Sequence, residues 1–214
     1  MKHLVFWFDP ISPFAYLAFE RLPQVLEGLS VEVSYRPLLF AGLLKHWGQK
    51  GPAEIEPKRA WTFRHVHWLA HRHGIEMQTP AQHPFNPLAL LRLMLACAPA
   101  GGTPNRFVCE TVLHHVWRGG LDASDAARLS DLTALLAPAR APDSDVVKHE
   151  LREATEAALT RGVFGVPSIE VDGRVFWGAD SLEMLGAHLR GDPWFASGVW
   201  EDAGAARPGL HRLV

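Results

Sequence analysis

Cysteine is scarce in this sequence. Of its 214 residues only Cys97 and Cys109 are cysteines, and their spacing matches neither a Cys-x-x-Cys redox pair nor a zinc site. Each lies in an apolar, helix-like stretch, so we expect both to be free, buried side chains. The scarcity therefore excludes dithiol chemistry and a cysteine-bound metal.

Long apolar runs and a surplus of basic charge are also missing. The apolar runs are interrupted within about ten residues, too few to cross a bilayer. The first residues lack the extended apolar core and the small-residue cleavage site of a signal peptide. With 21 basic and 23 acidic residues the formal net charge is −2, which provides no basic field for nucleic acid. We therefore expect a cytoplasmic protein without membrane or nucleic-acid partners.

The N-terminal part has the pattern of a βαβ unit. Residues 3–9 are typical of a buried strand. Ser12 is a good helix N-cap and Pro13 fits the first helical turn, so a helix should run from there to Gly28. Residues 31–36 alternate as a second strand. Short connections in this order predict parallel strands with a right-handed crossover.

The middle of the sequence is helical in pattern, and the end returns to strands. Asp172-Gly173 separates two alternating runs, 168–171 and 174–177, which predicts a hairpin followed by a helix at 182–189. The helices expected before the hairpin cover residues 38–47, 57–73, 87–98, 104–117, 124–136 and 143–161.

This order of elements predicts an α/β protein, in which a thioredoxin-like βαβ…ββα domain is interrupted by an all-helical insertion domain. A chain of this length is long enough for one domain with such an insertion. The expected boundaries are 1–38 and 163–192 for the thioredoxin-like domain, 39–162 for the insertion and 193–214 for a C-terminal tail.

The turn that carries Cys-x-x-Cys in redox proteins of this fold reads Ser12-Pro13-Phe14-Ala15 here. At a helix start the unpaired N–H groups and the macrodipole favour an anion, and a serine hydroxyl adds a donor. The influences that lower the pKa of a cysteine there would also favour an exogenous thiolate. The simpler alternative is that Ser12 only caps the helix. As a nucleophile it would need a base, and no Gly-x-Ser-x-Gly elbow is present.

Two dipeptides near the C-terminal strands are candidate ligand contacts. Val166-Pro167 is either an ordinary edge proline or a cis bond. A cis bond would direct the Val166 N–H and C=O toward a peptide such as glutathione, whose sulfur would then reach Ser12. At Asp180-Ser181 the carboxylate either caps the last helix or binds the α-amino group of a γ-glutamyl moiety, with helix N–H groups on the ligand's carboxylate.

Histidine is abundant, with 12 residues. His67 and His71 share a face of the expected helix at 57–73, but the glutamate of a His-Glu-x-x-His motif is absent between them. We therefore expect a solvated, partly buried helix face and no metal. A similar structural role is expected for the other clustered histidines, His65, His73, His114 and His115.

Several stretches of the sequence, taken together, resemble the 2-hydroxychromene-2-carboxylate isomerases. These enzymes are relatives of the kappa-class glutathione transferases and, more distantly, of DsbA. The resemblance covers residues 3–190. The stretches that carry it run from Asp9 to Ala18, from Arg36 to Leu39 with Lys45, from Pro57 to Arg59, from Pro84 to Asn86 and from Gly162 to Asp180.

The resemblance implies a homodimer that binds glutathione and a small aromatic substrate. Ser12 would orient or activate the glutathione thiol, and the thiolate would add to the substrate, allow rotation about a former double bond and then be expelled. The residues implied for glutathione are Ser12, Val166, Pro167, Gly178, Ala179, Asp180 and Ser181. The residues implied for the substrate are Lys45, Gln49, Lys58, Phe85 and Asn86.

Two stretches depart from the family pattern, and three other functions stay open. Gly48 to Pro52 replaces a Gly-Asn-Arg-Pro-Pro stretch, and Asp180-Ser181 replaces the usual Asp-Arg.

The alternatives to an isomerase are a kappa-like glutathione transferase that conjugates electrophiles and a cysteine-less thioredoxin-like binding protein. A DsbA-like disulfide oxidoreductase is disfavoured because the turn lacks both cysteines.

Overall fold

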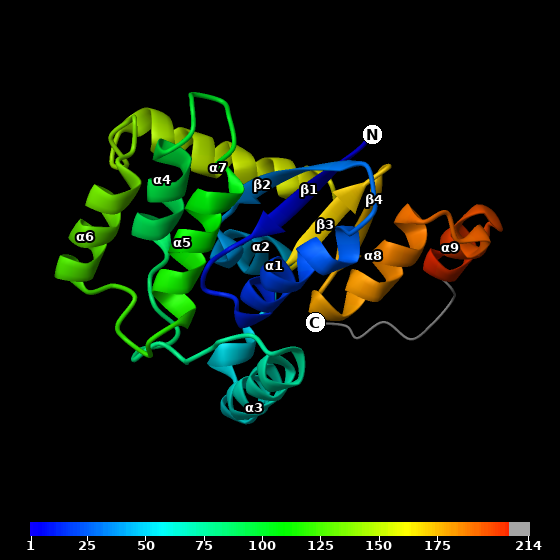
Figure 1. Ribbon diagram of the computed structural model, residues 1–214, viewed down its shortest axis with the longest axis horizontal. Coiled ribbons are helices and arrows are strands. Elements are labelled where there is room, and N and C mark those ends of the chain that lie inside the picture. Colours follow the sequence, from blue (N-terminus) through cyan, green and yellow to red (C-terminus); the bar gives the residue numbers. More distant parts are fainter. Residues whose placement is uncertain (206–214) are drawn as a thin grey trace.

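The computed structural model describes residues 1–205; residues 206–214, the end of the expected tail, lie outside that range. A four-stranded sheet at its centre consists of β1 (Lys2–Phe8), β2 (Val31–Pro37), β3 (Ser168–Val171) and β4 (Arg174–Trp177) (Figure 1). The strand order is β2-β1-β3-β4; β1 and β2 are parallel, and β3 is antiparallel to both neighbours. The expected thioredoxin-like βαβ…ββα order is confirmed.

Helix α1 (Pro13–Leu26) follows β1 and packs beside α8 (Leu182–Leu189), which follows β4 (Figure 1). The Oγ of Ser12 accepts the Ala15 N–H at 3.2 Å, and Pro13 takes the first helical position. The buried face of α1 meets the sheet, where the rings of Phe19 and Phe6 are 6.2 Å apart. The hydrophobic core therefore holds the helix that Ser12 caps.

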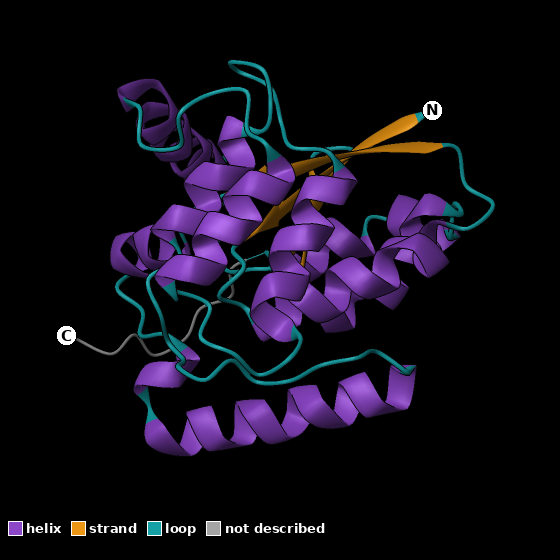
Figure 2. Cartoon of the chain, turned by 60° about the vertical axis from the view of Figure 1, so that its left-hand side comes forward, coloured by secondary structure: helices purple, strands orange, loops and turns teal. Residues whose placement is uncertain are grey.

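The chain between β2 and β3 is helical, as expected. Its helices are α2 (Phe40–Trp47), η1 (Pro52–Glu54), α3 (Glu56–His73), α4 (Leu88–Ala96), α5 (Arg106–Trp117), α6 (Ala126–Leu136) and α7 (Asp145–Thr160). Helix α3 runs along one side of the molecule (Figure 2) and packs against α1. Buried apolar side chains of α4 and α5 join those of β1 and α1 in one hydrophobic cluster, so the helical part and the sheet share a core.

Several helices start later than their sequence pattern predicts. Helix α2 begins at Phe40 rather than residue 38, because side chains distant in sequence bind the first N–H groups. Thr155 Oγ1 accepts the Leu39 N–H at 3.1 Å, and the Asp9 carboxylate accepts the Phe40 N–H at 2.9 Å. Helix α6 begins at Ala126, two residues later than expected, with Asp125 as its cap.

The C-terminal tail contains structure that its mixed composition does not predict. After η2 (Ala179–Ser181) and α8, the chain forms η3 (Pro193–Ala196) and α9 (Val199–Gly204). Phe195 and Trp200 lie against Phe176 of β4, with ring centroids 6.1 and 5.4 Å away. Aromatic packing thus attaches the tail to the sheet edge. None of the helices within residues 1–205 combines the length and apolar character needed to cross a bilayer.

Candidate functional site

The turn between β1 and α1 is held by a buried aspartate. The Asp9 backbone carbonyl accepts the Ser12 N–H at 3.0 Å. Its carboxylate is fully buried and accepts the N–H groups of Ile11 at 3.0 Å and Phe40 at 2.9 Å. Burial raises the pKa of Asp9 to about 7, although the two N–H donors oppose the shift. This carboxyl therefore ties the turn to the start of α2.

Ser12 lies where two distant parts of the chain meet. Its side chain is nearly buried, and its Oγ donates to the Val166 carbonyl at 3.3 Å while it accepts the Ala15 N–H. The Val166–Pro167 bond is cis, which decides between the two sequence-based interpretations of this dipeptide. The role of Ser12 as the N-cap of α1 is confirmed, and its hydroxyl also faces the Val166 carbonyl.

A large cavity of about 680 Å³ opens beside Ser12. Helices α2 and α3, the turn around η1, residues 83–87 and the segment before β3 surround it. Aromatic and aliphatic side chains form most of its wall: Phe40, Leu44, Phe63, Phe85, Phe164 and Trp177. Such a concave, apolar site with a few polar groups suits a small aromatic molecule.

Cations and a neutral histidine complete the wall of the large cavity. Lys50, Lys58 and Arg59 line it, and none forms a salt bridge within residues 1–205. His83 Nε2 donates to the Ile11 carbonyl at 2.9 Å, and burial lowers the pKa of His83, which favours the uncharged ring. The cavity therefore offers unpaired positive charge next to apolar surface.

A smaller cavity of about 280 Å³ lies beside the first, and Phe14, Val166 and Trp177 line both. Arg21 and Asp180 also line the smaller cavity. The glycine before η2, Gly178, has a φ of +93°, and a Cβ there would lie 2.3 Å from the Asp180 Oδ1. A glycine is thus required where the Asp180 carboxylate folds back against the chain.

The structure brings most of the expected site residues together. Of the residues implied for the substrate, Gln49, Lys58 and Phe85 line the large cavity with Ser12 and Val166. Of those implied for glutathione, Gly178, Ala179 and Asp180 line the smaller one. The remaining four, Lys45, Asn86, Pro167 and Ser181, line neither cavity.

Those four residues have other positions and contacts. Lys45 is exposed on α2, and Asn86 Oδ1 accepts the Leu88 N–H at 3.1 Å at the start of α4. The Pro167 carbonyl accepts the Gly178 N–H at 2.9 Å, and Ser181 Oγ donates to the Gly178 carbonyl at 2.8 Å. Pro167 and Ser181 thus support the backbone around Gly178.

The sequence patterns did not single out Asp9, Arg21, Arg59 or His83, which line the two cavities. A signal existed for Asp9, because it is an acidic residue directly after an apolar strand and it begins the stretch to Ala18 that carries the resemblance. Arg59 lies in the stretch from Pro57 that carries the family resemblance, whereas Arg21 and His83 show no such signal, since they approach the site only through helix packing and the loop before α4.

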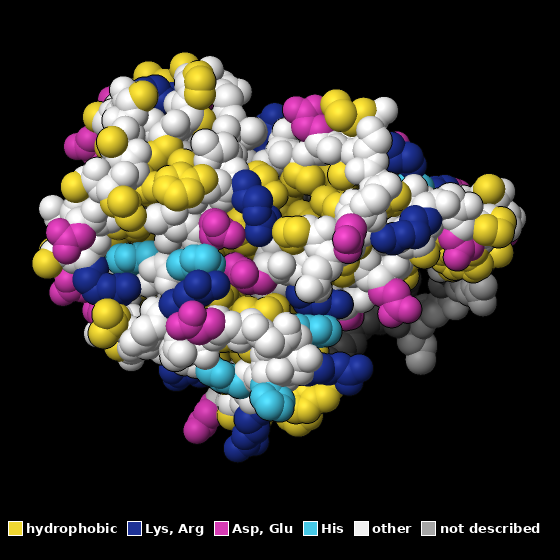
Figure 3. Space-filling model, in the orientation of Figure 1, with side chains coloured by type: hydrophobic (Ala, Val, Ile, Leu, Met, Phe, Trp, Pro, Cys, Tyr) yellow, Lys and Arg dark blue, Asp and Glu magenta, His cyan; other side chains and the backbone are white. Residues whose placement is uncertain are grey.

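Histidines gather on α3, on the lower face of the molecule in Figure 3. His67 and His71 are exposed, and His67 Nε2 lies 2.7 Å from Thr79 Oγ1. His115 Nε2 donates to the Ala123 carbonyl at 3.0 Å. These contacts give His67 and His115 hydrogen-bonding partners within the described part of the chain.

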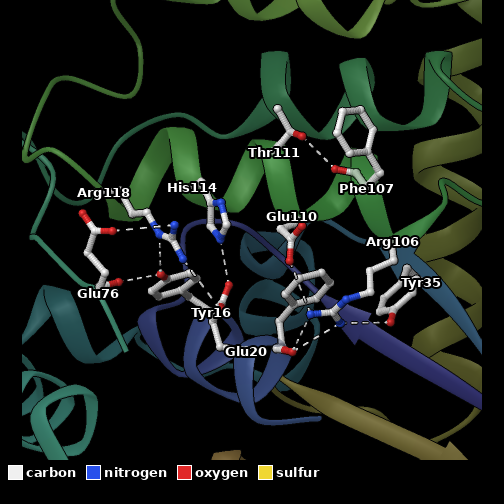
Figure 4. Close-up of polar contacts among 11 residues, drawn as sticks. Tyr16, Glu20, Tyr35, Glu76, Arg106, Phe107, Glu110, Thr111, His114 and Arg118 are labelled. Atoms are coloured by element: carbon white, nitrogen blue, oxygen red, sulfur yellow. Dashed lines mark hydrogen bonds and ion pairs between the residues drawn. The ribbon is translucent and has the colours of Figure 1, made fainter. Parts of the chain in front are cut away.

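One group in residues 1–205 has atoms close enough together to hold a metal ion: Glu20, Glu110 and His114. Both carboxylates already have cationic partners. Arg118 Nη2 lies 3.8 Å from Glu20, and Arg106 Nη2 lies 3.6 Å from Glu110. His114 Nε2 lies 2.9 Å from the Glu20 carboxylate (Figure 4). This arrangement is an ion-pair network between α1 and α5, and it steadies the helix that begins at Ser12.

Comparisons with known proteins agree on one relationship. A family model for the DSBA-like thioredoxin domain matches residues 3–190. The chain is 30% identical over 199 residues to the 2-hydroxychromene-2-carboxylate isomerase of Sphingobium xenophagum, covering 88% of this chain and 98% of that protein. It is 26% identical over 208 residues to glutathione S-transferase kappa 1 of Rattus norvegicus, covering 89% and 92%.

A solved structure extends the similarity to three dimensions. The selenomethionine form of 2-hydroxychromene-2-carboxylate isomerase matches with a TM-score of 0.77 at 21% identity. The match covers 95% of this chain and all of the other. The similarity therefore includes both the sheet with its flanking helices and the helical part that forms the large cavity.

Proposed function

Because the chain belongs to the DSBA-like thioredoxin domain family, among the 2-hydroxychromene-2-carboxylate isomerases and kappa-class glutathione transferases, we propose a specific activity. The protein is a glutathione-dependent cis–trans isomerase whose substrate is an aromatic, pyruvate-like compound of the 2-hydroxychromene-2-carboxylate type. One observation carries the proposal: Ser12 Oγ faces the Val166 carbonyl at the start of α1, beside an apolar cavity with unpaired cations.

The thiolate site is supported by the start of α1. A thiolate next to Ser12 would face the positive end of the helix macrodipole. The Ser12 hydroxyl can turn from the Val166 carbonyl, 3.3 Å away, and donate to the sulfur instead. Both effects stabilise the anion and lower the pKa of the bound thiol. Since no cysteine occupies the turn, glutathione supplies the sulfur.

The proposed reaction consumes no thiol. The glutathione thiolate adds to the carbon–carbon double bond of the ring-opened substrate, which forms a C–S bond and moves an electron pair onto the keto acid as an enolate. The former double bond is now single, so the groups on it can rotate. The enolate then re-forms the double bond and expels the thiolate, which leaves the trans isomer and unchanged glutathione.

The large cavity fits such a substrate. Its aromatic wall suits the substrate ring, and Lys58 and Arg59 can bind a carboxylate or stabilise the enolate that forms on addition. His83 already donates from Nε2 to the Ile11 carbonyl, so its neutral ring can only accept a hydrogen bond, through Nδ1, and it adds no charge because burial lowers its pKa.

The test is thiol-dependent conversion of the chromene carboxylate, followed by ultraviolet absorbance. Ser12→Ala should lower kcat at least 10-fold, because one donor to the thiolate is lost. Ser144→Ala is the matched control, since Ser144 does not line the cavity and caps α7 by the same type of contact, to the Val147 N–H. Conversion without any need for thiol, or equal kcat in wild type and Ser12→Ala, would contradict the proposal.

A second candidate is a transferase that conjugates glutathione to electrophiles. It is favoured by the similarity to the kappa-class protein over nearly the whole chain. The same thiolate site would serve, but the C–S bond would persist in the product. An aryl-halide conjugation assay distinguishes the two activities. If calorimetry detects no glutathione binding, the cysteine-less binding protein becomes the preferred function.

We also propose a homodimer and a cytoplasmic location. The dimer rests on the family resemblance alone, and sedimentation velocity tests it directly. A single monomer species at micromolar concentration would reject it. The location rests on the composition alone, and cell fractionation tests it.

A further inference from the structure

The outer face of α3 carries an exposed stripe of tryptophan and arginine. Trp61, Arg64, Trp68 and Arg72 follow one another at helical spacing, which places them on one face of the helix. Trp61 is 66% exposed and Trp68 is 52% exposed, and both arginines are exposed as well. Val66, on the opposite face, is fully buried. These four exposed residues form the α3 stripe, and two indole rings this open on one helix are typical of a surface that contacts a partner.

Helix α3 also concentrates positive charge. It contains four cationic residues and one acidic residue, so its excess of three positive charges contrasts with the net charge of −2 of the whole chain. None of these cations forms a salt bridge in the part of the chain that the structure describes. They are Lys58, Arg59, Arg64 and Arg72. The two arginines of the α3 stripe are therefore available to an anionic partner.

The indole rings of the α3 stripe already have stacking partners. The His65 ring stacks with both, 6.2 Å from Trp61 and 6.5 Å from Trp68 between ring centroids, with interplanar angles of 29° and 26°. The Arg72 guanidinium lies 5.4 Å from the centroid of the Trp68 ring. A nucleobase would compete with these groups for the ring faces, and a second copy of the chain would bring like charges together. The contacts and charges favour an anionic partner that meets the ring edges and the guanidinium groups.

We propose that the α3 stripe binds the surface of an anionic phospholipid bilayer. Tryptophan is enriched at the headgroup level of membranes, where its ring contacts apolar carbon and its N–H stays hydrated. Arg64 and Arg72 would pair with lipid phosphates beside the rings. The helix has 18 residues, which gives a length of about 27 Å, and it runs along one side of the molecule (Figure 2). Its outer face can therefore lie flat on the plane of a membrane.

Binding of this kind is peripheral. The absence of a membrane partner expected from the sequence concerned segments that cross a bilayer, and surface binding requires no such segment. None of the four stripe residues lines either cavity, so the binding is independent of the proposed thiol chemistry. Phe63, on another side of α3, does line the large cavity. The bound protein would therefore hold this cavity close to a phase in which apolar aromatic compounds dissolve.

Co-sedimentation of the full chain with lipid vesicles tests the proposal. Wild type should bind vesicles of phosphatidylcholine that contain about 30% phosphatidylglycerol, and it should not bind vesicles of phosphatidylcholine alone. Arg64→Gln combined with Arg72→Gln should weaken binding about 25-fold, since each arginine near an anionic surface contributes about 5-fold. Trp61→Ser combined with Trp68→Ser should weaken binding about 10-fold or more, because apolar contact is lost. Arg152→Gln, at an exposed arginine of α7, is the matched control and should bind like wild type.

Several results would overturn the proposal, once thermal unfolding has shown that each variant is folded. Equal binding of wild type to both kinds of vesicle, or to neither, would exclude recognition of an anionic bilayer. Wild-type affinity in the arginine variant would remove the α3 stripe from the contact. If wild type sediments as a dimer, the tryptophan variant as a monomer and neither binds vesicles, the stripe joins two copies of the chain. Binding of a single-stranded DNA oligonucleotide without vesicle binding would assign the stripe to nucleic acid.

Discussion

Replacing Asp9 by asparagine should make the protein more stable at neutral pH. The Asp9 carboxyl is fully buried, and no cationic side chain contributes to the shift of its pKa to about 7. Asparagine has nearly the same shape, and its side-chain oxygen can accept one of the two N–H groups, from Ile11 or Phe40. It therefore resembles the protonated acid, but it cannot ionise when the chain unfolds.

The magnitude follows from the two pKa values. In the unfolded chain the Asp9 carboxyl ionises near its ordinary pKa of 3.8, whereas in the folded protein it ionises near 7. Between these values only the unfolded state loses the proton, so the free energy of unfolding falls by about 1.4 kcal/mol per pH unit. The contribution is fully present below pH 3.8 and is lost as the pH rises to 7. The total loss is about 4 kcal/mol.

Urea unfolding at several pH values tests this reasoning. The stability of Asp9→Asn relative to wild type should increase by about 3 kcal/mol between roughly pH 4.5 and 7.5. Asp125→Asn, at the exposed cap of α6, controls for the loss of one negative charge. A stability difference for Asp9→Asn that stays constant with pH would refute the reasoning. It would mean that the two N–H donors outweigh burial and keep Asp9 ionised.

Three further predictions concern the cavity and the cysteines. In Gly165→Ala the new Cβ would lie 2.4 Å from Trp177 Nε1, so the indole must move; we expect the KM for the aromatic substrate to rise several-fold, and an unchanged KM would contradict this. Lys58→Met should raise the KM for the anionic substrate about 10-fold with little change in kcat, and a similar rise for its neutral methyl ester would argue against an ionic contact. Burial raises the pKa of both the Cys97 and the Cys109 thiols, so iodoacetamide treatment before glutathione is added should not reduce turnover. A loss of turnover in proportion to alkylation would show that the protein uses its own thiol.

Elements with strong local signals are correctly predicted from the sequence. Asp172-Gly173 forms the hairpin turn with φ values of +52° and +74°, which these two residue types tolerate better than others. Ser12 caps α1 because its hydroxyl needs only an N–H three residues ahead. The tail is different, because η3 and α9 depend on Phe195 and Trp200 reaching Phe176. The sequence around η3 and α9 alone does not show that these rings will contact Phe176, which is about 20 residues earlier in the chain.

The same contrast applies to the site. Ser12 and Val166-Pro167 are recognisable because each pairs a special residue type with a strand end. The burial of Asp9 depends on its bond to Phe40, 31 residues later, and Arg21 enters the smaller cavity only because α1 packs beside η2. Sequence patterns predict which turns are candidates for the chemistry, whereas the surrounding walls and charges follow from tertiary packing.

The position of β1 between β2 and β3 has a consequence for biosynthesis. β1 can pair with β2 as soon as the first 37 residues have left the ribosome, but its other edge waits for β3, at Ser168–Val171. At common translation rates that interval is on the order of 10 s. The nascent chain must therefore protect an open strand edge while the helical part is made. The contact between Ser12 and Val166 can form only after residue 166 has been made, so shorter nascent chains lack this part of the proposed thiolate site.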